Sequence, residues 1–158
     1  MQIKGVLQED FVNYKKPAMF ISMPSCTFKC ERECGIQCCQ NSALASAEPI
    51  EIDTETLVSK YLSNPITRAV VFGGLEPMDS FEDVVNFIRL LRGYNCRDDV
   101  VVYTGYNKEE ISGKIFALSA FPNVVVKYGR FVPNSEPRYD DVLGVTLASK
   151  NQYAERIS

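Results

Sequence analysis

Residues 69–77 read AVVFGGLEP, a run of β-branched and aromatic side chains that leads directly into a glycine-rich loop. The first four of these residues do not alternate between apolar and polar, which is typical of a strand covered on both faces of a sheet. Three further stretches share this pattern: Ala18–Ser22 (AMFIS), Val100–Tyr103 (VVVY) and Val124–Lys127 (VVVK). The sequence therefore predicts a sheet with four buried strands.

Helical patterns separate these strands, and each begins near a residue that can cap a helix. The capping residues are Asp53 or Thr54, Ser80 with Asp83 three residues later, and Asn107. The predicted helices are Thr54–Ser63, Ser80–Arg92 (ended by Gly93) and Asn107–Leu118. Strands that alternate with helices indicate βαβ units, so we expect one α/β domain over residues 1–158 with a mainly parallel sheet and flanking helices.

The rest of the chain carries weaker patterns. Further strands are predicted near Gln2–Leu7 and near Leu143–Leu147. Phe131–Asp141 contains two prolines and is predicted to form a surface loop. The last residues, Tyr153–Ser158, make a short tail that we expect to fray.

The composition excludes several classes of function. The chain has 158 residues, with 17 basic and 20 acidic side chains, a formal net charge of -3, six cysteines and no histidine. Without histidine it cannot form a Ser-His-Asp or Cys-His catalytic system or a zinc site with imidazole ligands. The slight negative charge does not favour binding to a nucleic-acid backbone.

The sequence also carries no sign of a membrane or secreted protein. No stretch approaches the roughly 20 apolar residues that span a bilayer. The start, MQIKGVLQED, lacks the basic and apolar regions of a signal peptide. We therefore expect a cytoplasmic protein with no membrane partner.

Five of the six cysteines lie close together in the sequence, at Cys26, Cys30, Cys34, Cys38 and Cys39. Because thiols inside a cell are normally reduced, such a group predicts metal binding or redox chemistry before disulfides. The spacing favours an iron–sulfur cluster, and zinc or a disulfide or redox relay are the alternatives. Cys96 lies apart and is interpreted as structural or incidental.

The local structure of this cluster loop, residues 24–41, is open at the level of sequence. Four of its cysteines, from Cys26 to Cys38, repeat every four residues, which suits one face of a helix. Pro24, Gly35 and the polar run Lys29–Arg32 make a loop at least as plausible.

Three predicted strands end in chemically unusual loops. The first leads into the cysteines, the second into Gly73–Pro77 and the third into Thr104–Tyr106. In sheets of this kind, ligands bind in the loops at the carboxyl ends of the strands. Taken alone, each of the last two loops is more typical of a tight turn or of packing than of a binding site. Together the three predict a site at one edge of the sheet.

The ordered set of motifs resembles radical S-adenosylmethionine (AdoMet) enzymes, and specifically the anaerobic ribonucleotide reductase activating proteins. The motifs cover nearly the whole chain: SCTFKC at Ser25–Cys30, CQN at Cys39–Asn41, VVFGGLEP at Val70–Pro77, VYTGY at Val102–Tyr106, YGRF at Tyr128–Phe131 and SKNQ at Ser149–Gln152. The resemblance implies a shortened and incomplete (βα) barrel of the radical AdoMet type.

The sequence departs from that family at three positions. The family pattern C-x-x-x-C-x-x-C would place its third cysteine at position 33, which is Glu33. We favour Cys39 as the third cysteine because the following residues reproduce the family's C-x-N, with Cys34 or Cys38 as alternatives. The glycine motif contains the additional Leu75, and Tyr128 stands where an acidic residue is usual.

The resemblance implies a cofactor set and a partner. Cys26, Cys30 and Cys39 would hold three irons of a 4Fe–4S cluster, and the fourth iron would bind AdoMet, which is cleaved to methionine and a 5′-deoxyadenosyl radical. AdoMet would be bound by Gly73, Gly74, Glu76, Pro77, Thr104, Gly105 and Tyr106. No side chain would act as a catalytic base, since the cofactors carry the chemistry.

By the same resemblance, the radical would take hydrogen from a glycine of the anaerobic ribonucleoside-triphosphate reductase, and a flavodoxin or ferredoxin would supply the electron. The alternatives are an activase of another glycyl-radical enzyme, a small radical AdoMet protein with another substrate, or a zinc or iron–sulfur module without catalysis. The roles of Asn151 and Gln152, in ligand binding or in closing the fold, stay open at this point.

Overall fold

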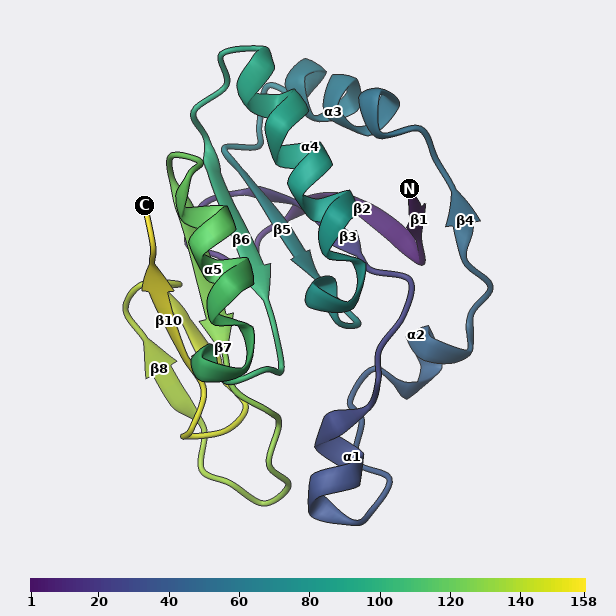
Figure 1. Ribbon diagram of the computed structural model, residues 1–158, viewed down its shortest axis with the longest axis vertical. Helices are drawn as coiled ribbons and strands as arrows, with labels where there is room; N and C mark the ends of the chain where they lie inside the picture. The colour runs from purple at the N-terminus through teal and green to yellow at the C-terminus, as the bar shows by residue number, and fades with distance from the viewer.

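A computed structural model describes all residues from 1 to 158 and contains a mixed six-stranded sheet with the strand order β10-β7-β6-β5-β3-β2 (Figure 1). The four central strands are parallel: β3 (Ala18–Ser22), β5 (Ala69–Gly73), β6 (Asp99–Tyr103) and β7 (Val124–Tyr128). The edge strands β2 (Gly5–Asp10) and β10 (Tyr153–Arg156) are antiparallel to their neighbours. The sheet is therefore open at both edges and does not close into a barrel.

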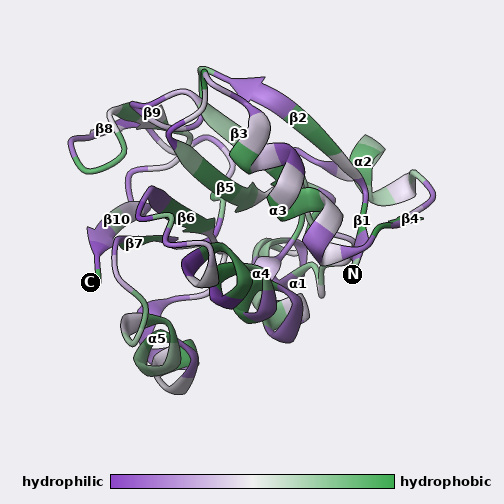
Figure 2. Ribbon diagram, turned by 90° about the horizontal axis from the view of Figure 1, so that it is seen from above, coloured by the Kyte–Doolittle hydropathy of each residue, from purple (hydrophilic) through white to green (hydrophobic).

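The central strands are covered on both faces, as their unbroken apolar pattern predicted. On one face, Val70 and Phe72 of β5 belong to the larger core, which also contains side chains of the helices. On the other face, Val71 packs in a smaller core with Leu143 and Leu147. Figure 2 shows hydrophobic segments in β5 and β6 and hydrophilic segments in the edge strands. Full burial of one such apolar side chain stabilises the fold by roughly 1.5–3 kcal/mol.

Three helices lie on the face of the larger core: α3 (Thr54–Ser63), α4 (Phe81–Gly93) and α5 (Ser112–Ser119) (Figure 1). The predicted bounds of α3 are confirmed, and Asp53 caps it by accepting a hydrogen bond from the Thr56 N–H at 2.9 Å. The prediction of a cap at Ser80 is wrong. Its side chain makes no capping bond, because a 3₁₀ turn, η1 (Pro77–Ser80), precedes α4 and Glu76 caps that turn instead.

The predicted helix Asn107–Leu118 is divided in the structure. Its first turn is the 3₁₀ segment η2 (Lys108–Ile111), and α5 follows. The Asn107 N–H donates to the Glu110 carboxylate at 2.8 Å, which holds the start of η2. None of the helices is both long and apolar enough to cross a membrane.

The cluster loop between β3 and α3 is partly helical. Only Lys29–Cys34 form a helix, α1, and a second short helix, α2 (Ser42–Ser46), follows. Gly35 ends α1 in the left-handed conformation with φ of 72°, which glycine adopts without strain. The four-residue cysteine repeat therefore does not form one continuous helical face.

Both ends of the chain differ from the sequence-based prediction. The strand predicted near Gln2–Leu7 is two strands, β1 (Gln2–Ile3), which pairs with β4 (Ile50–Glu51), and β2. The strand predicted near Leu143–Leu147 is the shorter β9 (Val145–Leu147), which pairs only with β8 (Arg138–Asp140). β8 itself lies in the segment that was predicted to be a loop.

The prediction of a frayed tail is wrong. Tyr153–Arg156 form β10, which pairs with β7 in the register Tyr153↔Tyr128 to Arg156↔Val125. The unpaired edge of β7 provides the hydrogen-bonding partner that orders this segment.

Candidate functional site

The loops that follow β3, β5 and β6 meet at one edge of the sheet, around a cavity of about 370 Å³. Residues of all three loops line it, together with Lys127 and Gly129 at the end of β7. The carboxyl ends of neighbouring parallel strands lie at the same sheet edge, which is why segments distant in the sequence converge there. The cavity continues beyond the cysteines to a second end, which is lined by Asn13, Tyr103 and β9.

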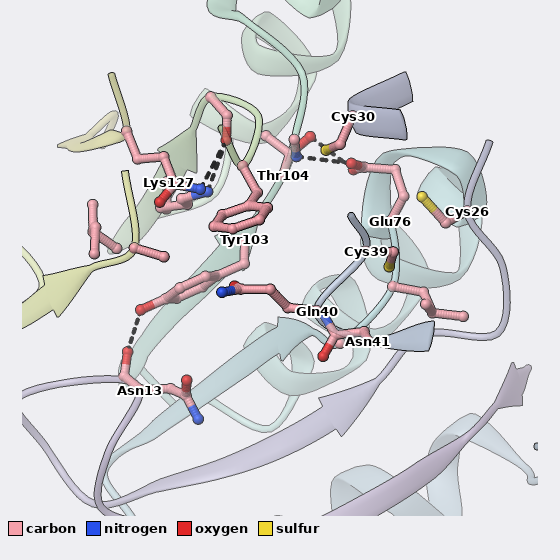
Figure 3. A pocket seen from close by; sticks show the side chains of 18 of the residues that line it. Asn13, Cys26, Cys30, Cys39, Gln40, Asn41, Glu76, Tyr103, Thr104 and Lys127 are labelled. Atoms are coloured by element: carbon pink, nitrogen blue, oxygen red, sulfur yellow. Dashed lines mark hydrogen bonds between the residues drawn. The ribbon is translucent and has the colours of Figure 1, made fainter. Parts of the chain in front are cut away.

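Three cysteines line this cavity: Cys26, Cys30 and Cys39. Figure 3 shows them around Glu76, with Lys127 and Asn13 toward the other end of the cavity. Cys34 and Cys38 are not among the lining residues, and their Sγ atoms lie 3.0 Å from each other. No three Cys, Asp or Glu side chains lie close enough together to hold a single metal ion.

Cys26 is held near the sheet by a short series of hydrogen bonds. Its Sγ accepts a hydrogen bond from the Phe28 N–H at 3.2 Å, and the neighbouring Thr27 N–H donates to the Asp79 carboxylate at 2.9 Å. Burial, together with the charges of Glu76 and Asp79, raises the pKa of Cys26 to about 11, and the hydrogen bond from Phe28 opposes the increase. Iron binding would therefore have to displace a proton from this thiol.

Cys39 is positioned by α1. Its backbone N–H donates to a carboxylate oxygen of Glu31 at 3.0 Å, across eight residues of the chain. Burial and the neighbouring Cys34 thiol raise the pKa of Cys38, the residue directly before it. The contact with Glu31 fixes the distance between Cys39 and the helix that carries Cys30.

The glycine-rich loop lies tightly against its neighbours. Gly74 has φ of 74°, and a Cβ atom at this position would lie 2.7 Å from a methyl carbon of Leu44 and 3.2 Å from Ser22 Cβ. Only glycine fits both the conformation and the space. The next residue, Leu75, is buried at 8% exposure and so belongs to the packed part of the loop.

Glu76 is the most constrained polar side chain of the site. Its carboxylate accepts hydrogen bonds from the Met78 N–H at 3.0 Å, the Thr104 hydroxyl at 2.7 Å and the Gly105 N–H at 2.8 Å. Burial raises its pKa, and these three donors oppose the increase. Its own N–H donates to the Ser25 carbonyl at 2.9 Å. Glu76 therefore joins all three loops.

Only some of the residues predicted to bind AdoMet line the cavity. Gly74, Glu76, Thr104 and Gly105 line it, whereas Gly73, Pro77 and Tyr106 do not. A Cβ atom at Gly105 would lie 3.5 Å from a Glu76 oxygen and 3.7 Å from Cys30 Sγ, so this glycine keeps the wall beside Cys30 open. The Tyr106 hydroxyl donates to Asp79 at 2.7 Å and so braces the loop that carries Cys26.

Lys127 is a lining residue that sequence reasoning missed. Its side chain is buried, and its ammonium donates to the Gly129 carbonyl at 2.9 Å. Burial lowers its pKa to about 8, against the opposing effects of Glu76 and Cys30. The signal in the sequence was a lysine that ends the otherwise apolar run VVVK, which we interpreted only as a strand.

Asn151 and Gln152 hold the turn that follows β7. Asn151 donates to the Arg130 carbonyl at 2.9 Å, and Gln152 donates to the Gly129 carbonyl at 3.2 Å. Gly129 has φ of 96°, so the turn depends on glycine. Gln152 also lines the cavity, and Asn151 does not. Both therefore close the fold, and Gln152 is in addition exposed to a ligand.

Ion pairs connect α1 to this turn. The buried Arg130 guanidinium makes two contacts with Glu110, at 2.7 and 2.8 Å, and its Nε lies 2.8 Å from Glu33. Lys29 also contacts Glu110, at 3.1 Å. Arg130 lowers the pKa of Glu110 to about 2. Through Glu33 and Lys29, α1 thus contacts η2 and the turn that follows β7.

The comparisons with known proteins indicate the kind of metal group that the chain binds. A family model described as a 4Fe-4S single cluster domain matches residues 18–152. The search of curated proteins found no match to this chain, and the search of solved structures found none either. Iron–sulfur clusters are held by cysteine thiolates, and three thiols facing one cavity fit such a group. The family match decides in favour of a cluster over the zinc alternative.

Proposed function

The chain belongs to the family of 4Fe-4S single cluster domains, and we propose that its cluster serves a radical AdoMet enzyme. The observation that carries this proposal is the meeting of three cysteines with the glycine-rich loop at one cavity. A cluster would fill only the part of this cavity beside the cysteines, and one that only carried electrons would not need the space beyond it, toward Asn13 and Tyr103, or the glycine wall beside Cys30. The four parallel strands beneath the cavity are consistent with an incomplete (βα) barrel of the radical AdoMet type.

The proposed cluster ligands are Cys26, Cys30 and Cys39. All three line the cavity, while Cys34 and Cys38 do not, which supports Cys39 as the third ligand. Three ligands for four irons leave one iron open to a substrate. Cys26, Cys30 and Cys39 would hold the cluster, which would supply the electron for reductive cleavage of AdoMet at its sulfonium C–S bond.

The chain's own residues would bind and orient AdoMet rather than react with it. Gly74 and Gly105 allow close approach to the backbone on either side of Glu76. Glu76 already accepts three hydrogen bonds from the protein, so its main role in the proposal is to hold the Thr104–Gly105 loop in place. Gly73, Pro77 and Tyr106 do not line the cavity, so in this proposal they would support the lining residues and would not contact AdoMet.

The proposed substrate is a glycine of an anaerobic ribonucleoside-triphosphate reductase, and a flavodoxin or ferredoxin would supply the electron in the cytoplasm. The support for this part is the resemblance to the activating proteins. The enzyme would then be an activase that generates a glycyl radical on a protein partner.

Anaerobic reconstitution with iron and sulfide tests the cofactors. We expect about four irons per chain, and formation of 5′-deoxyadenosine when AdoMet and a strong reductant are added. A chain that binds one zinc tightly and cleaves no AdoMet would contradict the proposal.

Single alanine variants test the ligands. Cys39→Ala should lose most of the iron and all AdoMet cleavage, because a cluster needs its third thiolate. Cys34→Ala and Cys38→Ala are matched controls in the same loop and should retain both. The reverse result, with Cys39→Ala active and Cys34→Ala inactive, would refute the assignment of Cys39.

The substrate is tested with the reconstituted enzyme and a purified anaerobic reductase. We expect a glycyl-radical signal in electron paramagnetic resonance that depends on AdoMet. AdoMet cleavage without this signal would point to another substrate and leave the cofactor assignment intact.

A further inference from the structure

Two cysteines of the cluster loop have no part in the proposed cluster. Cys34 is exposed, Cys38 is half-buried, and neither lines the cavity. Their Sγ atoms are nevertheless only 3.0 Å apart. A disulfide bond measures about 2.05 Å, so an approach of about 1 Å would join them.

The backbone brings these two thiols together. Cys34 is the last residue of α1, and Gly35 reverses the chain in the left-handed conformation, with its N–H donating to the Glu31 carbonyl at 2.9 Å. Cys34 Sγ also lies 3.4 Å from the Ile36 carbonyl inside the same turn. The proximity of Cys34 and Cys38 therefore follows from the way the chain turns at the end of the helix.

A bond between these residues would act on two proposed ligands. It would join the helix that carries Cys30 to the residue directly before Cys39, whose N–H already contacts Glu31 in α1. The disulfide bond and the existing hydrogen bond between Cys39 and Glu31 would both restrain Cys39 relative to α1. The bond would use none of the thiols that line the cavity.

We propose that Cys34 and Cys38 form a reversible disulfide that consumes peroxide and spares the three cluster ligands. Two S–H bonds break and one S–S bond forms, and the two electrons and two protons reduce one hydrogen peroxide to two waters. A dithiol reductant reverses the step. The sparing of ligands rests on the assignment of Cys26, Cys30 and Cys39 in the proposed function.

The first test uses cluster-free protein, kept anaerobic and treated with one equivalent of hydrogen peroxide. After alkylation under denaturing conditions, mass spectrometry should find four alkylated cysteines, at Cys26, Cys30, Cys39 and Cys96, and a Cys34–Cys38 disulfide. The Cys34→Ser variant should form no intramolecular disulfide at this dose. A disulfide that contains Cys26, Cys30 or Cys39 in the wild type, or no disulfide, would overturn the proposal.

The second test compares the wild type with the double variant Cys34→Ser/Cys38→Ser. Before oxidation, both should bind about four irons per chain and cleave AdoMet at equal rates. After peroxide, dithiol reduction and a second reconstitution, the wild type should regain most of its iron and the variant at most half as much. Equal recovery, or a variant that never binds iron, would overturn the proposal. If the proposed function itself were wrong, the untreated wild type would cleave no AdoMet, and this result is distinct from a failure of the disulfide proposal.

Discussion

The two walls of the cavity differ in how they are held. The wall formed by Gly73–Pro77 and Thr104–Tyr106 continues from buried strands, and Leu75 and Glu76 within it are themselves buried. The opposite wall is the cluster loop, in which neither α1 nor α2 contains a buried residue. Hydrogen bonds at its start and ion pairs along α1 attach it to the sheet.

This difference indicates that the two walls depend on a bound cofactor to different degrees. A wall with satisfied buried hydrogen bonds keeps its shape without a cofactor. A loop with exposed side chains has a low local stability and gains order from a bound metal group. The wall that continues from the strands is therefore preformed, whereas the cluster loop would gain order from a bound cluster.

The largest test of this comparison is Glu76→Ala in the preformed wall. The change leaves three buried donors without an acceptor, which should lower the free energy of unfolding by about 4 kcal/mol. Urea unfolding of the cluster-free protein measures it. Glu76→Gln keeps an acceptor and the side-chain shape and should lose about half as much. A loss below 1 kcal/mol for the alanine variant would show that this wall is not preformed.

The second test concerns the pH dependence that Lys127 gives to the same wall. Its pKa of about 8 lies below the ordinary 10.5, so between these values the unfolded chain holds a proton that the native chain has released. The free energy of unfolding should therefore rise with pH in this window, by up to about 3 kcal/mol relative to Lys127→Met. Below pH 8 the variant should be the more stable protein, since it buries no charge.

Urea unfolding of both proteins at pH 7 and pH 10 measures this difference. An unchanged difference at the two pH values would mean that Lys127 is solvated in the native protein.

Arg130→Met removes one of the two ion-pair contacts between the cluster loop and the rest of the protein, the contact with Glu33, and leaves Lys29 with Glu110. The variant removes the two contacts that the buried Arg130 makes with the exposed Glu110, and we expect a loss of about 1 kcal/mol at pH 7. The loss should shrink as pH falls from 4.5 toward 2, because Arg130 holds the pKa of Glu110 near 2 and protonation removes the ion pair. Amide hydrogen exchange should become faster in residues 28–41 and stay slow in β5 and β6. Faster exchange in these strands instead would contradict the inference that the wall they support is preformed.

The smallest effect is expected for Glu33→Ala in the cluster loop. The Glu33 side chain is 61% exposed, and when Glu33 is replaced Arg130 keeps both of its contacts with Glu110. Thermal unfolding should show a change below about 0.5 kcal/mol, as for other exposed ion pairs. A loss as large as that of Arg130→Met would mean that the stabilising contact of Arg130 is the one with Glu33 and not the pair with Glu110.

Sequence patterns predicted the centre of the fold better than its edges. The strand Ala18–Ser22 and the helix Thr54–Ser63 have their predicted bounds, because each carries a complete local signal of unbroken apolar side chains or a capped amphipathic face. The segment Tyr153–Arg156 carries no such signal. It becomes a strand only because the edge of β7 is unpaired beside it.

In the site too, features with a local sequence signal were predictable and those that depend on distant residues were not. The cysteines and glycines could be identified from the sequence because thiolate chemistry and left-handed backbone restrict the residue type. The partners of Glu76 could not, since Thr104 and Gly105 lie 28 and 29 residues away along the chain. The burial of Lys127 likewise depends on segments that meet it only in the folded chain.

By itself, the sequence determined that this is an α/β protein with a local group of thiols that can bind metal and without histidine chemistry, because these properties follow from residue type and short spacing. Only the tertiary structure decided which cysteines share a cavity and which two lie beside each other. That choice depends on where Gly35 turns the chain and on the contacts of Cys39 with Glu31 and of Glu33 with Arg130. Such contacts across loops are set by packing, which spacing in a sequence does not encode.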